Sequence, residues 1–112
     1  MRDAARKIQL RQEISGQDRR SLWAYCDEEG NLQVDGQDLG PGTALVSSDG
    51  EYEWSESVKA ADIPRLVELL GGAPGEDILR LLERRFCGVA SYEFEGTLRE
   101  SGLPVKTWVW SG

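Results

Sequence analysis

The spacing of apolar residues changes twice along this chain, and these two changes constrain its fold more than any other feature. Before Ala60 apolar residues recur at every second position, as in "KIQLRQEI" and "SLWAYC", which is the period of a strand with one buried face. After Ala60 they recur at helical spacing, as in "DIPRLVELL" and "DILRLLERRF". At Leu103 the period of two returns in "LPVKTWVWS". The chain is therefore predicted to be an α+β protein.

The expected topology follows from the lengths of the connections. Strands are predicted over residues 7–14, 21–26, 32–39 and 51–60, and the links between them are too short for parallel crossovers, so an antiparallel meander of four strands is expected. Helices are predicted over residues 60–72 and 75–86, with a third, less regular one over 92–101. They should lie on one face of the sheet, with the C-terminal strand 103–111 rejoining it. The whole chain, 1–112, is expected to form a single domain.

The absence of histidine excludes several classes of catalytic site. Without it the chain has no Ser-His-Asp or Cys-His system, and no zinc or iron site that requires imidazole. Catalysis would depend on carboxylates, lysine, tyrosine or cysteine alone, so a non-enzymatic role is favoured. No metal and no cofactor is expected.

The formal net charge of −7 is concentrated in the middle of the chain, since residues 21–60 contain nine acidic residues and one basic residue. Such a segment repels a phosphate backbone, so no nucleic acid is expected as a partner and a basic protein is favoured. Surplus carboxylates that only keep the protein soluble explain the charge equally well. No stretch approaches the ~18 apolar residues of a membrane span and no signal peptide is recognisable, so a cytoplasmic location without membrane contact is expected.

The stretch "DEEGNLQVDGQDLGPG", residues 27–42, is rich in carboxylates and glycine, as ion-binding loops are. It does not match an EF-hand loop, because the glycine or the closing glutamate is missing from its required position in each register. It does not match a phosphate-binding loop either, because no Gly-Lys-Ser/Thr follows the glycines. A turn, a strand and a second turn are the simpler interpretation. Gly36 and Gly40 are predicted to adopt backbone conformations that other residues avoid.

The same stretch carries a resemblance. The segments "DEEGNLQVDGQDLGPGT", "EYEW" and "DIPRLVELL" resemble a family of small uncharacterised bacterial proteins, which share an Asp-x-x-Gly-Asn-Leu hairpin, a Gly-Gln-Asp-Leu-Gly segment, a Tyr-Glu-Trp strand and an Ile/Val-Pro-x-Leu helix. The match runs from Asp27 to Leu70. It implies a shared fold and a bacterial origin, and it transfers no catalytic residues. Some small acidic bacterial α+β proteins are immunity proteins that neutralise a toxin, which is an analogy of size and charge alone.

Aromatic residues occur as three i,i+2 pairs, so each pair projects from one face of its predicted strand. The pairs are Trp23/Tyr25, Tyr52/Trp54 and Trp108/Trp110. Aliphatic residues alternate with the first and third pairs, which predicts an aliphatic sheet face under the helices and an aromatic face away from them.

An uncovered aromatic face would bind protein or stack on a sugar, whereas the alternative is that the aromatics fill the core. A core position is favoured for Tyr52/Trp54. For Trp108/Trp110 the two readings are balanced, and at least one of these indoles is predicted to be more than about a third exposed or covered only by a second chain.

Three carboxylates of the fourth predicted strand are candidates for binding or chemistry. Glu51 and Glu53 share one strand face, whereas Glu56 falls on the other face, among apolar residues. A bulge near Ser55, burial beside an arginine, or a functional role would each explain Glu56.

Three hypotheses for function remain, and the first is favoured. It is a protein-binding module, immunity-like in the sense of the analogy above, that recognises a basic partner such as a toxin. Its candidate binding residues are Trp23, Tyr25, Trp108, Trp110, Glu51, Glu53 and Glu56. The second is a carboxylate-based enzyme acting on a carbohydrate, which a deep pocket at Glu56 would support. The third is a divalent-cation binder at the acidic loops between Asp27 and Asp49, which stabilisation by calcium would support. A homodimer is a further option for the partner.

Overall fold

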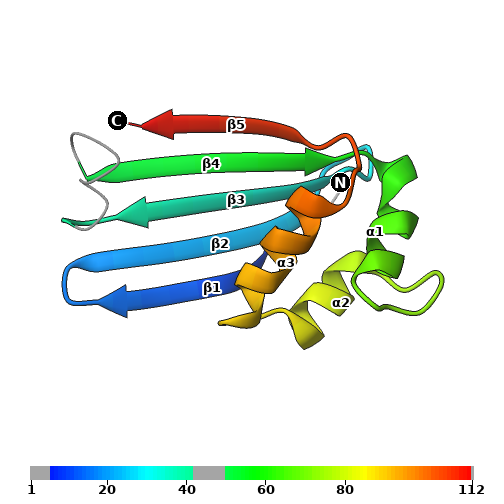
Figure 1. Ribbon diagram of the computed structural model, residues 1–112, viewed down its shortest axis with the longest axis horizontal. Coiled ribbons are helices and arrows are strands. Elements are labelled where there is room, and N and C mark those ends of the chain that lie inside the picture. Colours follow the sequence, from blue (N-terminus) through cyan, green and yellow to red (C-terminus); the bar gives the residue numbers. More distant parts are fainter. Residues whose placement is uncertain (1–5, 42–49, 112) are drawn as a thin grey trace.

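The computed structural model describes residues 6–41 and 50–111 of the chain. Five strands form one antiparallel sheet in which neighbours in sequence are neighbours in space, so the order is β1-β2-β3-β4-β5 (Figure 1). The strands are β1 (Ile8–Ser15), β2 (Asp18–Cys26), β3 (Leu32–Leu39), β4 (Glu51–Val58) and β5 (Lys106–Ser111). The predicted meander and the return of the last strand to the sheet are confirmed.

Three α-helices separate β4 from β5 in the sequence. A 3-10 turn, η2 (Ala60–Asp62), leads into α1 (Ile63–Leu69), which is followed by α2 (Ile78–Arg85) and α3 (Ala90–Glu100). α2 begins after Asp77, whose carboxylate accepts a hydrogen bond from the Arg80 backbone N–H at 3.1 Å and so caps the helix. Within the described residues, none of the helices has the length and apolar character needed to cross a membrane.

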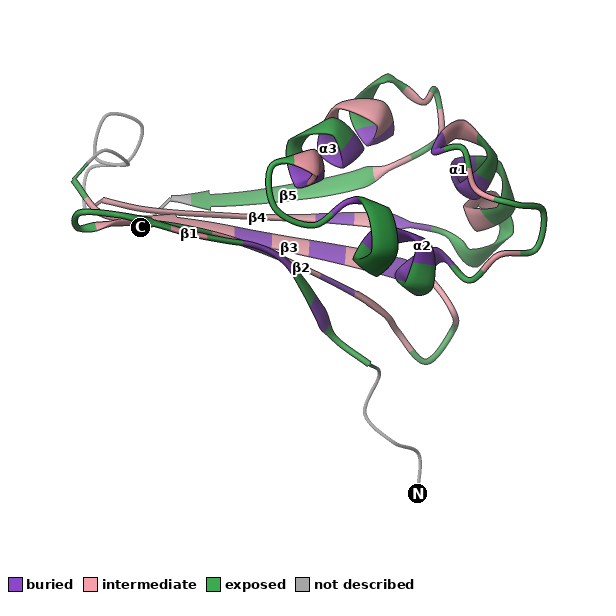
Figure 2. Cartoon of the chain, turned by 90° about the horizontal axis from the view of Figure 1, so that it is seen from below, coloured by how far each residue is buried: buried purple, intermediate pink, exposed green. Residues whose placement is uncertain are grey.

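The helices lie on one face of the sheet and cover only part of it (Figure 2). They pack over the end of the sheet that holds the β2–β3 turn, and the end with the β1–β2 turn extends beyond them (Figures 1 and 2). The buried apolar residues of the sheet lie at the covered end: Ile8, Leu10, Leu22, Ala24, Leu32, Val34 and Val58. From the helices, Leu66, Leu81, Leu82, Phe94 and Leu98 are fully buried against them. Each such side chain stabilises the fold by roughly 1.5–3 kcal/mol through burial alone.

β1 departs from the strict alternation predicted for it. A bulge between Gln9 and Arg11 shifts the register, so that Arg11 pairs with Leu22 and faces the helices. Leu10, at the bulge, accepts a hydrogen bond through its carbonyl from the Gly88 N–H at 2.7 Å. Ile14, which the alternation places on the buried face, is exposed instead. That prediction is wrong because a contact with a distant loop, invisible to local periodicity, resets the strand.

The two glycines highlighted by the sequence are needed for different reasons. Gly40 has φ of +119°, a conformation that other residues rarely adopt, as predicted. Gly36 is not among the positive-φ residues, so the predicted unusual backbone is wrong there. Its requirement is space, because a Cβ at Gly36 would lie 2.1 Å from carbons of the Trp54 indole.

Candidate functional site

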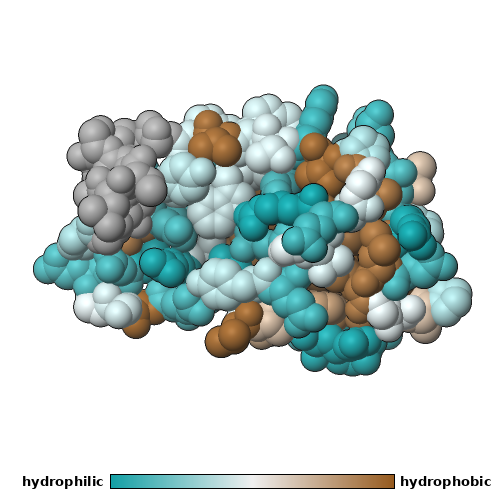
Figure 3. All heavy atoms as spheres, in the orientation of Figure 1, coloured by the Kyte–Doolittle hydropathy of each residue, from teal (hydrophilic) through white to brown (hydrophobic). Residues whose placement is uncertain are grey.

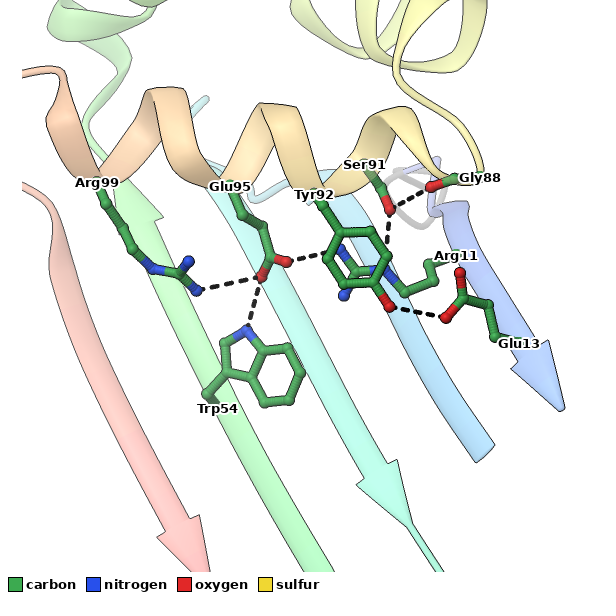
Figure 4. A network of polar contacts seen from close by, with 8 residues as sticks. All are labelled: Arg11, Glu13, Trp54, Gly88, Ser91, Tyr92, Glu95 and Arg99. Carbon is green, nitrogen blue, oxygen red and sulfur yellow. Dashed lines mark hydrogen bonds and ion pairs between the residues drawn. The ribbon is translucent and has the colours of Figure 1, made fainter. Parts of the chain in front are cut away.

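A buried ion pair joins α3 to the sheet (Figure 4). Arg11 Nη2 donates to Glu95 Oε1 at 2.6 Å, and Arg11 Nε donates to Ser91 Oγ at 2.8 Å. Both charged residues are only 3% exposed. Ser91 Oγ donates in turn to the Gly88 carbonyl at 2.5 Å, so the loop that bonds to Leu10 also orients the serine. The bulge in β1 and the start of α3 therefore position the pair together.

The second carboxylate oxygen of Glu95 is also held by protein groups. Trp54 Nε1 donates to Glu95 Oε2 at 3.1 Å, and Arg99 Nη2 lies 3.6 Å from the same atom (Figure 4). Donors from β1, β4 and α3 thus converge on one carboxylate. We infer that Glu95 organises its surroundings and is poorly placed to bind a ligand directly.

Tyr92 covers one side of the ion pair. The guanidinium carbon of Arg11 lies 3.5 Å from the centroid of the Tyr92 ring, which is a stacked cation–π contact. The Tyr92 hydroxyl donates to Glu13 Oε1 at 2.7 Å. Burial raises the pKa of Tyr92, and the hydrogen bond to Glu13 raises it further. The phenol therefore stays a neutral donor at physiological pH.

A cavity of about 410 Å3, which we call the α3 pocket, opens beside this network. Its charged lining residues are Arg11, Arg20, Asp38, Glu56, Glu95 and Arg99. Tyr52, Trp54 and Tyr92 give it aromatic surface, and the Tyr52 and Trp54 ring centroids lie 5.7 Å apart at an interplanar angle of 38°. On this face of the molecule hydrophilic side chains predominate around α3, whereas apolar side chains gather towards α1 and α2 (Figure 3).

Two carboxyl groups of the α3 pocket have an oxygen without a hydrogen-bond partner. Among the described residues these buried oxygens are Glu56 Oε1 and Asp38 Oδ1. Glu56 is 4% exposed, and burial raises the pKa of its carboxyl; Arg99 opposes this effect and Glu95 adds to it. Burial also raises the pKa of Asp38, against the lowering effects of Arg20 and Arg11. Both carboxyls thus accept protons more readily than exposed carboxyls do.

The raised pKa of Glu56 predicts a pH-dependent loss of stability. Between the ordinary glutamate pKa and the raised one, the folded state binds more protons than the unfolded state, so the free energy of unfolding falls as pH rises. The Glu56→Gln variant cannot titrate at this position. We expect wild type to lose stability relative to Glu56→Gln on going from about pH 3 to about pH 8, as measured by urea unfolding at each pH. A difference between the two proteins that stays constant, or that changes in favour of wild type, would contradict this assignment.

None of the described helices covers the opposite face of the sheet, which we call the open face (Figure 2). Trp23, Asp35, Ser55 and Trp108 form one cross-strand row on it, because each pairs with the next in register. Trp108 and Trp110 are 45% and 53% exposed, which confirms the prediction of an exposed indole on the last strand. The predicted aromatic face away from the helices therefore exists.

The open face has a shallow hollow of about 320 Å3 near its centre. Trp23, Asp35, Glu53 and Trp110 are among the residues that line it. Lys7 also lines the hollow, and its Nζ lies 5.4 Å from the centroid of the Trp23 ring. Aromatic rings and carboxylates thus surround a place where the chain's own ammonium group already makes a cation–π contact.

The structure places the sequence-predicted binding residues on two faces. Trp23, Tyr25, Glu51, Glu53, Trp108 and Trp110 share the open face by strand alternation and register. Glu56 lies on the opposite, helix-covered side and lines the α3 pocket. β4 pairs in continuous register with both neighbours, so the alternative of a bulge near Ser55 does not explain Glu56. Glu56 is buried in a pocket that Arg99 also lines. A pocket at Glu56 exists, as the enzyme hypothesis requires, but Glu51 and Glu53 cannot reach it.

Several residues of the α3 pocket were not predicted from the sequence. Strict alternation along residues 7–14 places Arg11 on the solvent-facing side of the strand, and its burial follows from the bulge. The signal for the others lies in α3, where Ser91, Glu95 and Arg99 follow one another at i,i+4 and flank the apolar stripe of Phe94 and Leu98. Two buried polar residues beside such a stripe indicate a partner across the core.

In the turn that begins at Asp27, neighbouring N–H groups donate hydrogen bonds to the Asp27 carboxylate. Asp27 accepts hydrogen bonds from the Glu29 N–H at 2.9 Å, the Asn31 N–H at 3.0 Å and Gln33 Nε2 at 2.8 Å. The turn interpretation of this segment fits these contacts. Asp49, the other end of the hypothetical cation site, lies outside the described residues. Within residues 6–41 and 50–111, no group of three or more acidic or cysteine side chains is arranged to hold a metal ion.

Comparisons with protein-family models, with curated proteins and with solved structures find no match to this chain.

Proposed function

We propose that this chain is a cytoplasmic protein-binding module that uses its open face to dock a protein with a basic surface. The observation that carries the proposal is the collection of four aromatic side chains around two carboxylates on a sheet face without helices. These aromatics are Trp23, Tyr25, Trp108 and Trp110. Interfaces are enriched in tryptophan and tyrosine, because such rings bury a large area at little cost in side-chain entropy.

Exposed apolar area supports docking on this face. Trp108 and Trp110 are both about half exposed on β5, an edge strand whose Val109, on the other face, is also 54% exposed and not buried as the aliphatic-face prediction required. Indoles in this position contribute little to the stability of the monomer, and a contiguous patch of them usually marks an interaction surface. We therefore expect Trp110→Ala to weaken binding more than it lowers stability.

Charge supports a basic partner. Asp35 and Glu53 lie between the tryptophans, and the whole chain has a formal charge of −7. A lysine or arginine entering the hollow would meet two carboxylates and two indole faces at once. Within the chain, Lys7 over Trp23 and Lys106 over Trp108, 5.9 Å from its centroid, already make contacts of this kind.

Selection from a phage-displayed library of random peptides tests the proposal. The selected peptides are expected to combine lysine or arginine with an apolar residue, and the best of them is then synthesised for calorimetry. We expect Trp110→Ala, and separately Asp35→Asn/Glu53→Gln, to weaken its binding by about tenfold, the effect of losing a hot-spot contact. The matched control is Glu93→Gln/Glu100→Gln, which removes the same charge from exposed positions on α3.

Three results would overturn this proposal. The first is that the selected peptides lack basic residues, and the second is that the control variant weakens binding as much as the open-face variants do. The third is a concentration-dependent dimer in light scattering that Trp108→Ala/Trp110→Ala abolishes, since a second copy would then occupy the open face.

A further inference from the structure

The α3 pocket lies on the other side of the sheet from the open face, so protein docking does not account for it. Its volume of about 410 Å3 falls within the usual range of small-molecule sites. Six charged side chains line the pocket, which the packing of an apolar core does not require. Buried charged groups are costly unless they are paired, and here some acceptors are not paired.

The formal charges of the pocket cancel. Three guanidinium groups, those of Arg11, Arg20 and Arg99, face three carboxyls, those of Asp38, Glu56 and Glu95. The carboxyls disfavour phosphates and other anions, and the guanidinium groups disfavour polyamines and other cations. A neutral ligand meets neither penalty.

The α3 pocket retains both acceptors and donors for hydrogen bonds to a ligand. Asp38 and Glu56 each retain a buried oxygen without a hydrogen-bond partner among the described residues, so each carboxyl has an unused acceptor. The Arg99 side chain is more than half exposed and pairs with Glu95 at 3.6 Å through Nη2, so its guanidinium has further N–H groups for an acceptor. A matching ligand must therefore both donate and accept, which hydroxyl groups do.

The aromatic surface adds a requirement of shape. Tyr52 and Trp54 lie next to each other on β4 and both line the pocket. A sugar ring has an apolar C–H face, which packs on such rings, and a rim of hydroxyls, which would reach the charged groups around them. Neutral saccharides combine both properties in one molecule.

We propose that the α3 pocket binds a neutral mono- or disaccharide, with its C–H face on Tyr52 and Trp54 and its hydroxyls between Glu56, Asp38 and Arg99. Glu95 acts as a positioning residue, because it fixes the Trp54 indole through the 3.1 Å hydrogen bond and holds Arg99 near the pocket. The proposal concerns binding and does not depend on the docking of a protein at the open face.

Nuclear magnetic resonance titration tests the proposal, because the Trp54 indole N–H is bonded to Glu95 in the α3 pocket. Trp54 also lines the hollow of the open face, whereas Thr107 and Val109 line the α3 pocket and not that hollow, so the three signals together locate the ligand. The full chain is titrated with millimolar glucose, galactose, N-acetylglucosamine, maltose and cellobiose, and in parallel with inorganic phosphate and putrescine. At least one saccharide is expected to shift the Trp54 indole and the amides of Thr107 and Val109, and to leave the indoles of Trp108 and Trp110 unchanged.

Four variants locate the binding. Glu56→Gln and Arg99→Gln are each expected to weaken the saccharide by about three- to tenfold, the effect of one lost hydrogen bond. Glu93→Gln, an exposed change on the same helix, should leave the affinity unchanged, as should Asp35→Asn/Glu53→Gln on the open face. Dispersion of the amide spectrum shows that each variant is folded before its affinity is compared.

The proposal is overturned if no saccharide of this panel shifts the Trp54 indole. It is also overturned if phosphate or putrescine binds the pocket more tightly than every saccharide, or if the shifts map to the open face. Because the open-face variants test a separate surface, loss of saccharide binding leaves the docking proposal standing, and the reverse also holds.

Discussion

Replacing Arg11 with methionine is expected to lower the free energy of unfolding by about 3–5 kcal/mol, the usual effect of breaking a buried ion pair. Methionine fills the space of the arginine stem but leaves the Glu95 carboxylate, 3% exposed, without the donor at 2.6 Å. It also removes the hydrogen bond to Ser91 and the contact with the Tyr92 ring. Urea unfolding monitored by circular dichroism measures the change.

Two further variants distinguish the effect of losing the ion pair from the effect of losing packing contacts. In Arg11→Met/Glu95→Leu no buried charge is left alone, so the double variant is expected to be more stable than Arg11→Met. Arg65→Met breaks the exposed pair with Glu68 and should change stability by less than about 1 kcal/mol. If Arg11→Met behaves like Arg65→Met, the pair does not hold α3 on the sheet.

Replacing Gly36 with alanine is expected to destabilise the protein by about 3 kcal/mol, towards the upper end for an overpacked core. The new Cβ would lie 2.1 Å from the Trp54 indole, so the ring must move. Its hydrogen bond to Glu95 would then be stretched or lost. The expected result is a lower midpoint of urea unfolding together with a shifted Trp54 indole resonance.

A glycine without neighbours provides the control for this effect. Gly96 lies inside α3, and a Cβ there would meet nothing within 4 Å, so Gly96→Ala is expected to stabilise the helix by roughly 0.5–1 kcal/mol. In a Trp54→Leu background the clash disappears, and Gly36→Ala should then have little effect. Equal destabilisation by Gly36→Ala with and without the indole would show that the strand backbone, not the ring, requires glycine.

The order of elements was predictable because each kind of element has its own apolar period. The change of period at Ala60 and its reversal near Leu103 correspond to the real boundaries between sheet and helices. The faces of Trp23 and Trp108 followed from alternation alone, because the β2–β3 pair and the β4–β5 pair are each in continuous register. Local periodicity was sufficient wherever a strand remained regular.

The α3 pocket was not predictable in the same way. The position of Arg11 depends on a bulge that is stabilised by Gly88, far away in the sequence. Glu56 was recognised as an exception to alternation, but its neighbours Glu95 and Arg99 come from a helix whose placement over β4 no local pattern specifies. Sites built from distant segments become visible only when the packing of helix on sheet is known.

The part of the sheet that extends beyond the helices has a consequence for dynamics. At that end the strands are held by ladder hydrogen bonds and cross-strand pairs such as Arg19 with Leu39, and none of the described helices packs on either side. Amide groups there should open to solvent by local fraying, at a free energy well below that of global unfolding, while those beneath α2 and α3 open only with the whole domain. The α3 pocket lies at the border of these two regimes. A molecule bound in it would contact both the rigid helix and the mobile sheet end, and would slow the exchange of the strands it touches.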